Sequence, residues 1–85
     1  MATQTADIAG LVRAIVEPLV DHKEDVDVRQ SVDEYGNIYC EVSVHEDDTG
    51  KVIGRQGRVI KSIRTVARAA GSRAGAGQVD VELPD

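Results

Sequence analysis

The sequence predicts an α+β domain with two layers, in which helices pack on one face of a three-stranded sheet. Apolar residues recur at helical spacing near the start of the chain and again after residue 58, and they alternate with polar residues around residues 40 and 80. The predicted order is helix, strand, strand, short helix, helix, strand. With 85 residues, the chain is expected to form one domain, 1–85, with a single small core.

The first element is an amphipathic helix over about residues 5–17. Its apolar positions follow helical spacing: Ile8, Leu11, Val12, Ile15, Val16 and Leu19. Thr5 or Asp7 is expected to cap its start. Pro18 ends or kinks the helix, and the pair Leu19-Val20 is expected to continue onto the core.

Residues 26–44 predict a β-hairpin. Val26, Val28 and Val32 alternate with polar residues, and a turn signal at 33–37 follows, in which Gly36 or Asn37 can adopt a positive φ. The second strand shows the clearest pattern in the chain. Its apolar residues Ile38, Cys40, Val42 and Val44 alternate strictly with Tyr39, Glu41, Ser43 and His45. One face of this strand is therefore expected to be buried and the other exposed to solvent.

The second half predicts a short helical turn near 51–53, a loop, and a helix from Arg58 to Gly71, where Gly71 is expected to stop it. One face of this helix is apolar, with Val59, Ile60, Ile63, Val66, Ala67 and Ala70. The opposite face is basic, with Arg58, Lys61, Arg64 and Arg68. Residues 71–77 predict a flexible loop, and Val79, Val81 and Leu83 alternate with acidic residues as a last strand.

Charge is distributed unevenly. The chain has a net charge of −5, but residues 1–50 carry 12 acidic and 3 basic side chains, whereas residues 51–85 carry 7 basic and 3 acidic ones. The segment 51–73 contains all seven of these basic residues and no acidic one. We therefore expect a locally positive surface on an acidic molecule, which favours a confined contact with a polyanion.

The tetrapeptide Gly54-Arg55-Gln56-Gly57 lies at the start of the basic helix. Glycines permit a close approach of backbone and ligand, and a helix N-terminus offers unpaired N–H groups and a positive dipole end. Together these features predict an anion site, and a polymer of phosphates is the ligand that also uses a line of basic side chains. The chain contains two Tyr, no Trp and no Phe, which disfavours recognition by stacking bases on a sheet surface.

The sequence shows none of the motifs expected for several other classes of function. The apolar runs are too short to span a membrane, no secretory signal is visible, and the single Cys40 is expected to be buried in a reducing cytoplasm. His22 and His45 are far apart in the sequence and have no metal motif nearby, so no metal or other cofactor is expected. The carboxylates fall on solvent positions, no nucleophile–base pair stands out, and the G-x-x-x-x-G-K-[ST] motif is absent, which argues against an enzyme.

The stretch from Val52 to Lys61, VIGRQGRVIK, resembles the I-G-x-x-G core of KH domains. The order of elements is that of the bacterial type II KH domain, and the resemblance covers roughly residues 5–84. The small size resembles the single-KH-domain RNA-binding proteins of bacteria. This resemblance implies a non-catalytic protein whose loop 54–57 grips the backbone of single-stranded RNA, while an aliphatic groove accepts about four nucleotides.

Carried over to this chain, the resemblance implies that Gly54, Arg55, Gln56 and Gly57 clamp the RNA backbone, with Ile53 beside the groove. Independently of the resemblance, basic side chains near the loop can neutralise phosphate charge. The expected RNA-binding residues are therefore Lys51, Ile53, Gly54, Arg55, Gln56, Gly57, Arg58, Lys61 and Arg64. Val59 and Ile60 would help to line or support the groove. The resemblance further implies a role as an RNA chaperone or post-transcriptional regulator, and a homodimer or a heterodimer with another KH-domain RNA-binding protein.

Alternative interpretations remain open. In the first alternative, Gly54 and Gly57 only form a tight turn between two helices. In the second, the basic face of the last helix is an ordinary solvated surface. For Arg68 and Arg73 we favour this solvated surface, and pairing with acidic residues of the first half is equally open. In the third, the protein is a scaffold whose sheet or first helix docks a partner protein, with the loop vestigial.

Overall fold

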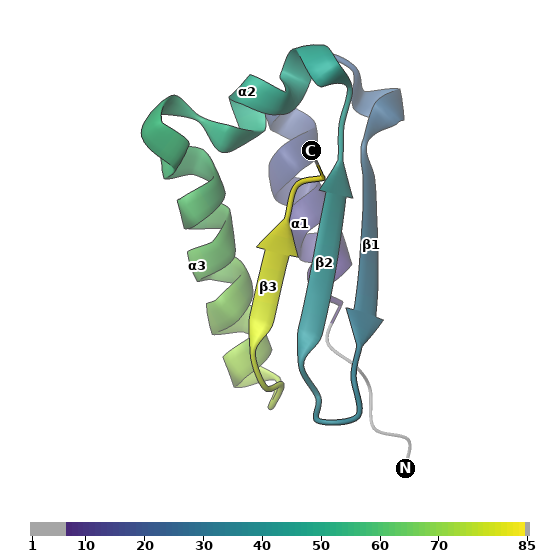
Figure 1. Ribbon diagram of the computed structural model, residues 1–85, viewed down its shortest axis with the longest axis vertical. Helices are drawn as coiled ribbons and strands as arrows, with labels where there is room; N and C mark the ends of the chain where they lie inside the picture. Colours follow the sequence, from purple (N-terminus) through teal and green to yellow (C-terminus); the bar gives the residue numbers. More distant parts are fainter. Residues whose placement is uncertain (1–6, 85) are drawn as a thin grey trace.

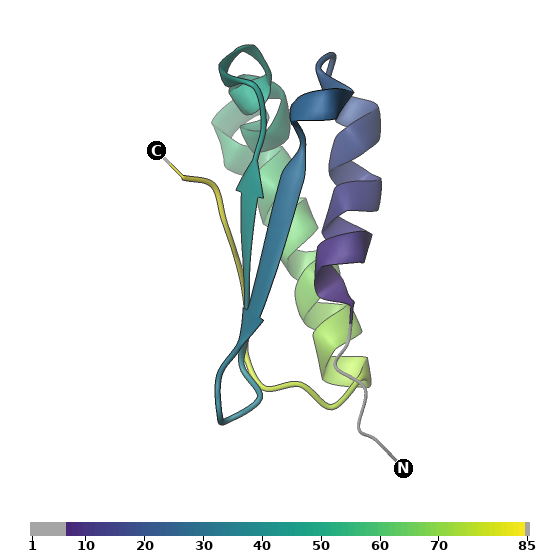
Figure 2. The same cartoon turned by 90° about the vertical axis from the view of Figure 1, so that its right-hand side faces the viewer.

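The computed structural model describes residues 7–84 and has a sheet with helices on one face (Figures 1 and 2). β1 (Asp27–Val32) pairs antiparallel with β2 (Ile38–Ser43), and β2 pairs parallel with β3 (Val79–Glu82), in the order β1-β2-β3. The helices are α1 (Ile8–Val16), α2 (Thr49–Ile53) and α3 (Arg58–Arg73). The fold class and the order of elements are as predicted.

Four 3₁₀ turns connect these elements within the described residues: η1 (Glu17–Leu19), η2 (Lys23–Asp25), η3 (Glu46–Asp48) and η4 (Arg55–Gly57). In the described part of the chain, no helix combines the length and the apolar character needed to cross a membrane.

Helix α1 carries two rows of apolar side chains along its length, and only one of these rows is fully buried. The buried row, Ile8, Val12 and Val16, continues to Val20 after η1. The Asp7 side chain accepts a hydrogen bond from the Gly10 N–H at 2.9 Å, which confirms this cap, whereas Thr5 lies outside the described residues. The expectation that Leu19 is buried is wrong: it is 38% exposed, because it lies on the second row of the helix, away from the sheet.

The core lies between the sheet and helices α1 and α3. Ile38, Cys40 and Val42 of β2 are buried, and the register places Val79 and Val81 of β3 beside the first two. The other side of β2 is exposed, as the strict alternation predicted. Parallel pairing of β2 with β3 requires a long crossover, which α2 and α3 supply.

Helix α3 differs from the prediction at its end. It continues through Gly71 to Arg73, because Gly71 is buried against Val79 and a Cβ there would lie 2.4 Å from Val79 Cγ2. The helix ends in a Schellman motif, in which the Ala76 and Gly75 N–H groups donate to the Gly71 and Ser72 carbonyls.

Val66 lies on the apolar face of α3, which was expected to face the core, but it is not buried. It is 44% exposed, because the apolar stripe of α3 is wider than the strip that the sheet covers. The buried positions are Ile60, Ile63, Ala67 and Gly71.

Candidate functional site

The loop Gly54–Gly57 joins α2 to α3 at the end of the molecule opposite the β1–β2 turn (Figure 1). Gly54, Gln56 and Gly57 all have positive φ angles of 77°, 56° and 74°. The Gly57 N–H donates to the Gly54 carbonyl oxygen at 3.1 Å, which closes the turn. The tip of this turn presents the exposed Arg55 and Gln56.

Helix α3 begins directly after this turn without a side-chain cap. Its first-turn N–H groups and the positive end of its dipole therefore face the loop without a side-chain partner. A 16-residue helix of this kind favours an anion at its start.

Three basic side chains surround the loop. Arg55, Arg58 and Lys61 are exposed, and none of them forms an ion pair with another described residue. The Arg58 guanidinium donates to Gln56 Oε1 at 3.4 Å, so Gln56 orients it beside the loop. These cations are available to a ligand.

Lys51 has a different environment from the one expected at the loop. Its ammonium group donates to Asp21 Oδ2 and, at 3.0 Å, to Asp48 Oδ1. Hydrogen bonds to these two carboxylates raise the pKa of Lys51. Its charge is therefore balanced within the protein, and sequence reasoning missed this because Asp21 is 30 residues away.

Asp48 corrects the expectation that all carboxylates lie on solvent positions. It is fully buried, and its oxygens accept hydrogen bonds from the Asp21 and His22 N–H groups and from Lys51. Burial favours the neutral acid, but hydrogen bonds from His22, Lys51 and Asp21 outweigh this and hold the pKa of Asp48 well below its usual range. Asp48 thereby ties the segment after α1 to α2, which precedes the loop.

Arg64 was expected to bind RNA and Arg68 to lie on a solvated face, and the structure places both against β3. Arg64 Nε donates to the Val81 carbonyl oxygen at 3.0 Å, and Arg68 Nε donates to that of Val79 at 3.4 Å. Since β3 is the edge of the sheet, these guanidinium groups occupy edge carbonyls that would otherwise be unpaired. These two cations lie along the α3–β3 edge, although β3 itself carries Asp80 and Glu82.

The other side of α3 is apolar. A groove between α1 and α3 is lined by Ile15, Leu19, Arg58, Val59, Ser62, Ile63 and Val66. It begins beside the loop, because Val59 packs directly against Gly54. Of the other predicted groove residues, Ile53 is 37% exposed on α2, and Ile60 is buried in the core.

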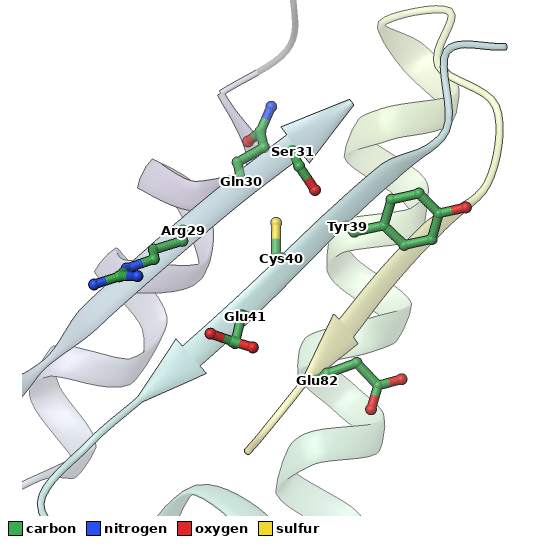
Figure 3. A pocket seen from close by; sticks show the side chains of 7 residues that line it. All are labelled: Arg29, Gln30, Ser31, Tyr39, Cys40, Glu41 and Glu82. Atoms are coloured by element: carbon green, nitrogen blue, oxygen red, sulfur yellow. The ribbon is translucent and has the colours of Figure 1, made fainter. Parts of the chain in front are cut away.

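The open face of the sheet has a different character. Figure 3 shows a hollow there that is lined by Arg29, Gln30, Ser31, Tyr39, Cys40, Glu41 and Glu82. Two carboxylates from neighbouring strands, Glu41 and Glu82, lie in register on this face. This arrangement disfavours phosphate, and Tyr39 is the single aromatic side chain of the hollow.

Two histidines that are distant in sequence are adjacent in the structure. The His22 and His45 rings stack with centroids 3.8 Å apart and planes inclined by 13°. His22 Nδ1 lies 3.0 Å from Asp48 Oδ2, and this hydrogen bond raises the pKa of His22. Sequence reasoning missed the pair because no local spacing connects positions 22 and 45.

Comparisons with known proteins give one consistent result. Residues 9–83 match the family described as "KhpA/KhpB, KH domain". The RNA-binding protein KhpA of Bacillus subtilis (strain 168) is 53% identical over 65 residues, which cover 75% of this chain and 78% of that protein. The protein of the same name from Streptomyces coelicolor is 44% identical over 71 residues, which cover 84% of each chain. The Halalkalibacterium halodurans protein is 48% identical over 63 residues, or 74% of this chain and 82% of that protein.

Proposed function

Because this chain belongs to the KhpA/KhpB family of KH domains, we propose that it binds single-stranded RNA through the loop Gly54–Gly57. The relatives described above are named as RNA-binding proteins. The family assignment agrees with the expectation that the protein is not an enzyme. We propose that it acts in the cytoplasm as an RNA chaperone or post-transcriptional regulator.

One observation carries the proposed binding mode: Arg55, Arg58 and Lys61 are exposed on the loop and the first turns of an uncapped helix, and none forms an ion pair with another described residue. Phosphate oxygens accept hydrogen bonds from free N–H groups and from guanidinium and ammonium groups. Unpaired RNA exposes its phosphates and its base edges together, whereas a duplex buries the base edges between its strands.

Charge favours one path for the RNA beyond the loop. On the α3–β3 side, Arg64 adds a positive charge in the second turn of α3, whereas the α1–α3 groove carries Arg58 alone at its end. A polyanion therefore binds more favourably on the α3–β3 side than in the α1–α3 groove. We therefore place the RNA along the first turns of α3 on its β3 side, with Ile53 beside it.

The test of the clamp is charge reversal at its tip. We expect Arg55→Asp with Gln56→Asp to abolish binding of a mixed-sequence single-stranded RNA in fluorescence anisotropy, because two carboxylates would repel phosphate. Asp tolerates the left-handed backbone of position 56, so the fold should persist in circular dichroism.

The control for this test is Ser72→Asp with Arg73→Asp, which makes the same change of charge at the exposed far end of α3. It should bind RNA nearly as well as the parent protein. Equal losses in both double variants would show a diffuse electrostatic surface, and unchanged binding in the loop variant would exclude the clamp. A duplex of the same sequence should bind more weakly than the single strand.

The apolar α1–α3 groove supports a second proposal, self-association. Ile15 of α1 and Leu19 of η1 form an apolar strip with Val59 and Val66 of α3, beside the loop. A second copy of this chain presents the same strip, so a two-fold axis would bury both at once. A dimer would present two loops and raise avidity for RNA.

A further inference from the structure

His22, His45 and Asp47 form a compact group of ligand-type side chains away from the loop. One nitrogen from each ring and one carboxylate oxygen of Asp47 all lie within 4.8 Å of one another. His22 follows η1, whereas the other two follow β2, so the fold brings the group together. None of these residues belongs to the proposed RNA-binding surface.

The buried Asp48 fixes the orientation of His22. Its Oδ2 lies 3.0 Å from His22 Nδ1, so Nδ1 carries the proton and Nε2 of the neutral ring keeps its lone pair. A carboxylate behind an imidazole is the usual outer partner of a metal-binding histidine, because it fixes the tautomer and raises the basicity of the other nitrogen. His22 is thus prepared as a donor.

His45 and Asp47 face each other across a short turn. His45 Nδ1 accepts from the Asp47 N–H at 3.0 Å and lies 3.6 Å from Asp47 Oδ2. The side chains of His22, His45 and Asp47 are 37%, 31% and 71% exposed, so an ion from solvent can reach all three. The carboxylate of Glu24 adds negative charge near His22.

We propose that His22, His45 and Asp47 bind one divalent transition-metal ion, for which Zn²⁺ is the natural probe. Two imidazoles and one carboxylate are a donor set that suits Zn²⁺, Ni²⁺ or Co²⁺, whereas Mg²⁺ and Ca²⁺ prefer oxygen ligands alone. Three protein ligands leave a fourth position for water.

Binding requires a small rearrangement. Parallel stacked rings do not aim two lone pairs at one point, so one ring must turn about its Cβ–Cγ bond, a soft torsion. Tetrahedral Zn²⁺ with bonds of about 2.0–2.1 Å needs ligand atoms about 3.3 Å apart. His45 is the ring that turns, since Asp48 holds His22, and turning it gives up the hydrogen bond that His45 Nδ1 accepts from the Asp47 N–H.

The experiment is calorimetric titration of the tag-free, full-length protein with Zn²⁺, and in parallel with Mg²⁺. We expect one equivalent of Zn²⁺ to bind and Mg²⁺ not to compete. His45→Ala and His22→Ala should each lower Zn²⁺ affinity by about tenfold or more, as loss of a ligand or its support does in other sites. Glu24→Gln, which removes a nearby charge but no ligand, should keep affinity within about threefold.

A second measurement does not depend on the folding of any variant. In NMR spectra of the parent protein, Zn²⁺ should shift the ring signals of both histidines together and reach saturation at one equivalent. Independent shifts of the two rings, equal competition by Mg²⁺, or unchanged Zn²⁺ affinity in a folded His45→Ala protein would each overturn the proposal. RNA affinity of the loop is not part of this test, so the two proposals fail separately.

Discussion

Gly54 and Val59 approach each other so closely that no larger residue fits at position 54. A Cβ on Gly54 would lie 2.3 Å from Val59 Cγ2 and 2.8 Å from the Val59 backbone nitrogen, and the φ of Gly54 is +77°. This contact sets the direction in which α3 leaves the loop. The first glycine of the loop therefore has a structural role in addition to any contact with RNA.

Gly54→Ala is expected to destabilise the protein by about 1–3 kcal/mol, because it combines a clash with a backbone conformation that is nearly exclusive to glycine. Gly50→Ala is the matched control, since it lies in α2 with nothing within 4 Å of the added Cβ. That control should gain up to about 1 kcal/mol from helix propensity. Urea unfolding of both variants checks the pair, and a Gly54→Ala protein as stable as the parent would contradict this account of the loop.

The basic residues of α3 should differ in their effect on RNA. Arg58→Ala and Lys61→Ala are each expected to weaken binding by up to about 1 kcal/mol, in the range of exposed charged contacts. Arg68→Ala should do much less, because it lies about 15 Å along the helix from Arg58. Anisotropy titrations with one RNA compare them, and an equal effect of Arg68 and Arg58 would contradict a localised clamp.

Arg64 needs its own comparison, because its Nε donates to the Val81 carbonyl oxygen. Arg68→Ala removes a similar contact with β3 and serves as the control for that loss. We expect Arg64→Ala to weaken RNA binding more than Arg68→Ala at a similar change in stability.

Self-association should depend on Val66. Val66→Asp puts a charge into the apolar groove, and we expect it to shift the protein to monomer in sedimentation equilibrium while changing stability by no more than about 0.5 kcal/mol. Val32→Asp is the control, since Val32 is also 44% exposed but lies on β1. A dimer that survives Val66→Asp, or is lost equally in both variants, would point to another interface.

Asp33 should make stability depend on pH. The Asn37 N–H donates a hydrogen bond to the Asp33 carboxylate, and this bond lowers the pKa of Asp33 below its ordinary value. Partial burial opposes the shift, and further hydrogen bonds from the Asn37 side-chain amide and the Tyr35 N–H add to it. A lowered pKa in the folded state contributes stability above the unfolded value, and this contribution is lost as pH falls through the folded value.

We therefore expect the parent protein to be more stable than Asp33→Asn at neutral pH, with the difference shrinking as the pH falls below the ordinary pKa of an aspartate, about 3.9. Denaturant unfolding of both proteins across this range measures it. A difference that stays constant with pH would show that the charge of Asp33 does not stabilise the turn.

The local sequence pattern was sufficient to predict much of the fold and the tip of the loop. Strict alternation identified β2, because a half-buried strand requires it, and the spacing of two glycines before a basic helix identified the turn and its exposed Arg55. These features depend on neighbours within a few residues. A helix propensity rule nevertheless misjudged Gly71, whose place inside α3 depends on Val79 across the core.

Tertiary structure decided which charges are free and which distant side chains meet. Lys51 and Arg64 look equivalent to Arg58 in the sequence, yet Asp21 and Asp48 balance the first and the Val81 carbonyl binds the second. The burial of Asp48 and the stacking of His22 on His45 likewise join positions more than 20 residues apart. The physical reason is the same in each case: a side chain's partner is set by the packing of whole elements, and the periodicity of one element carries no information about the next.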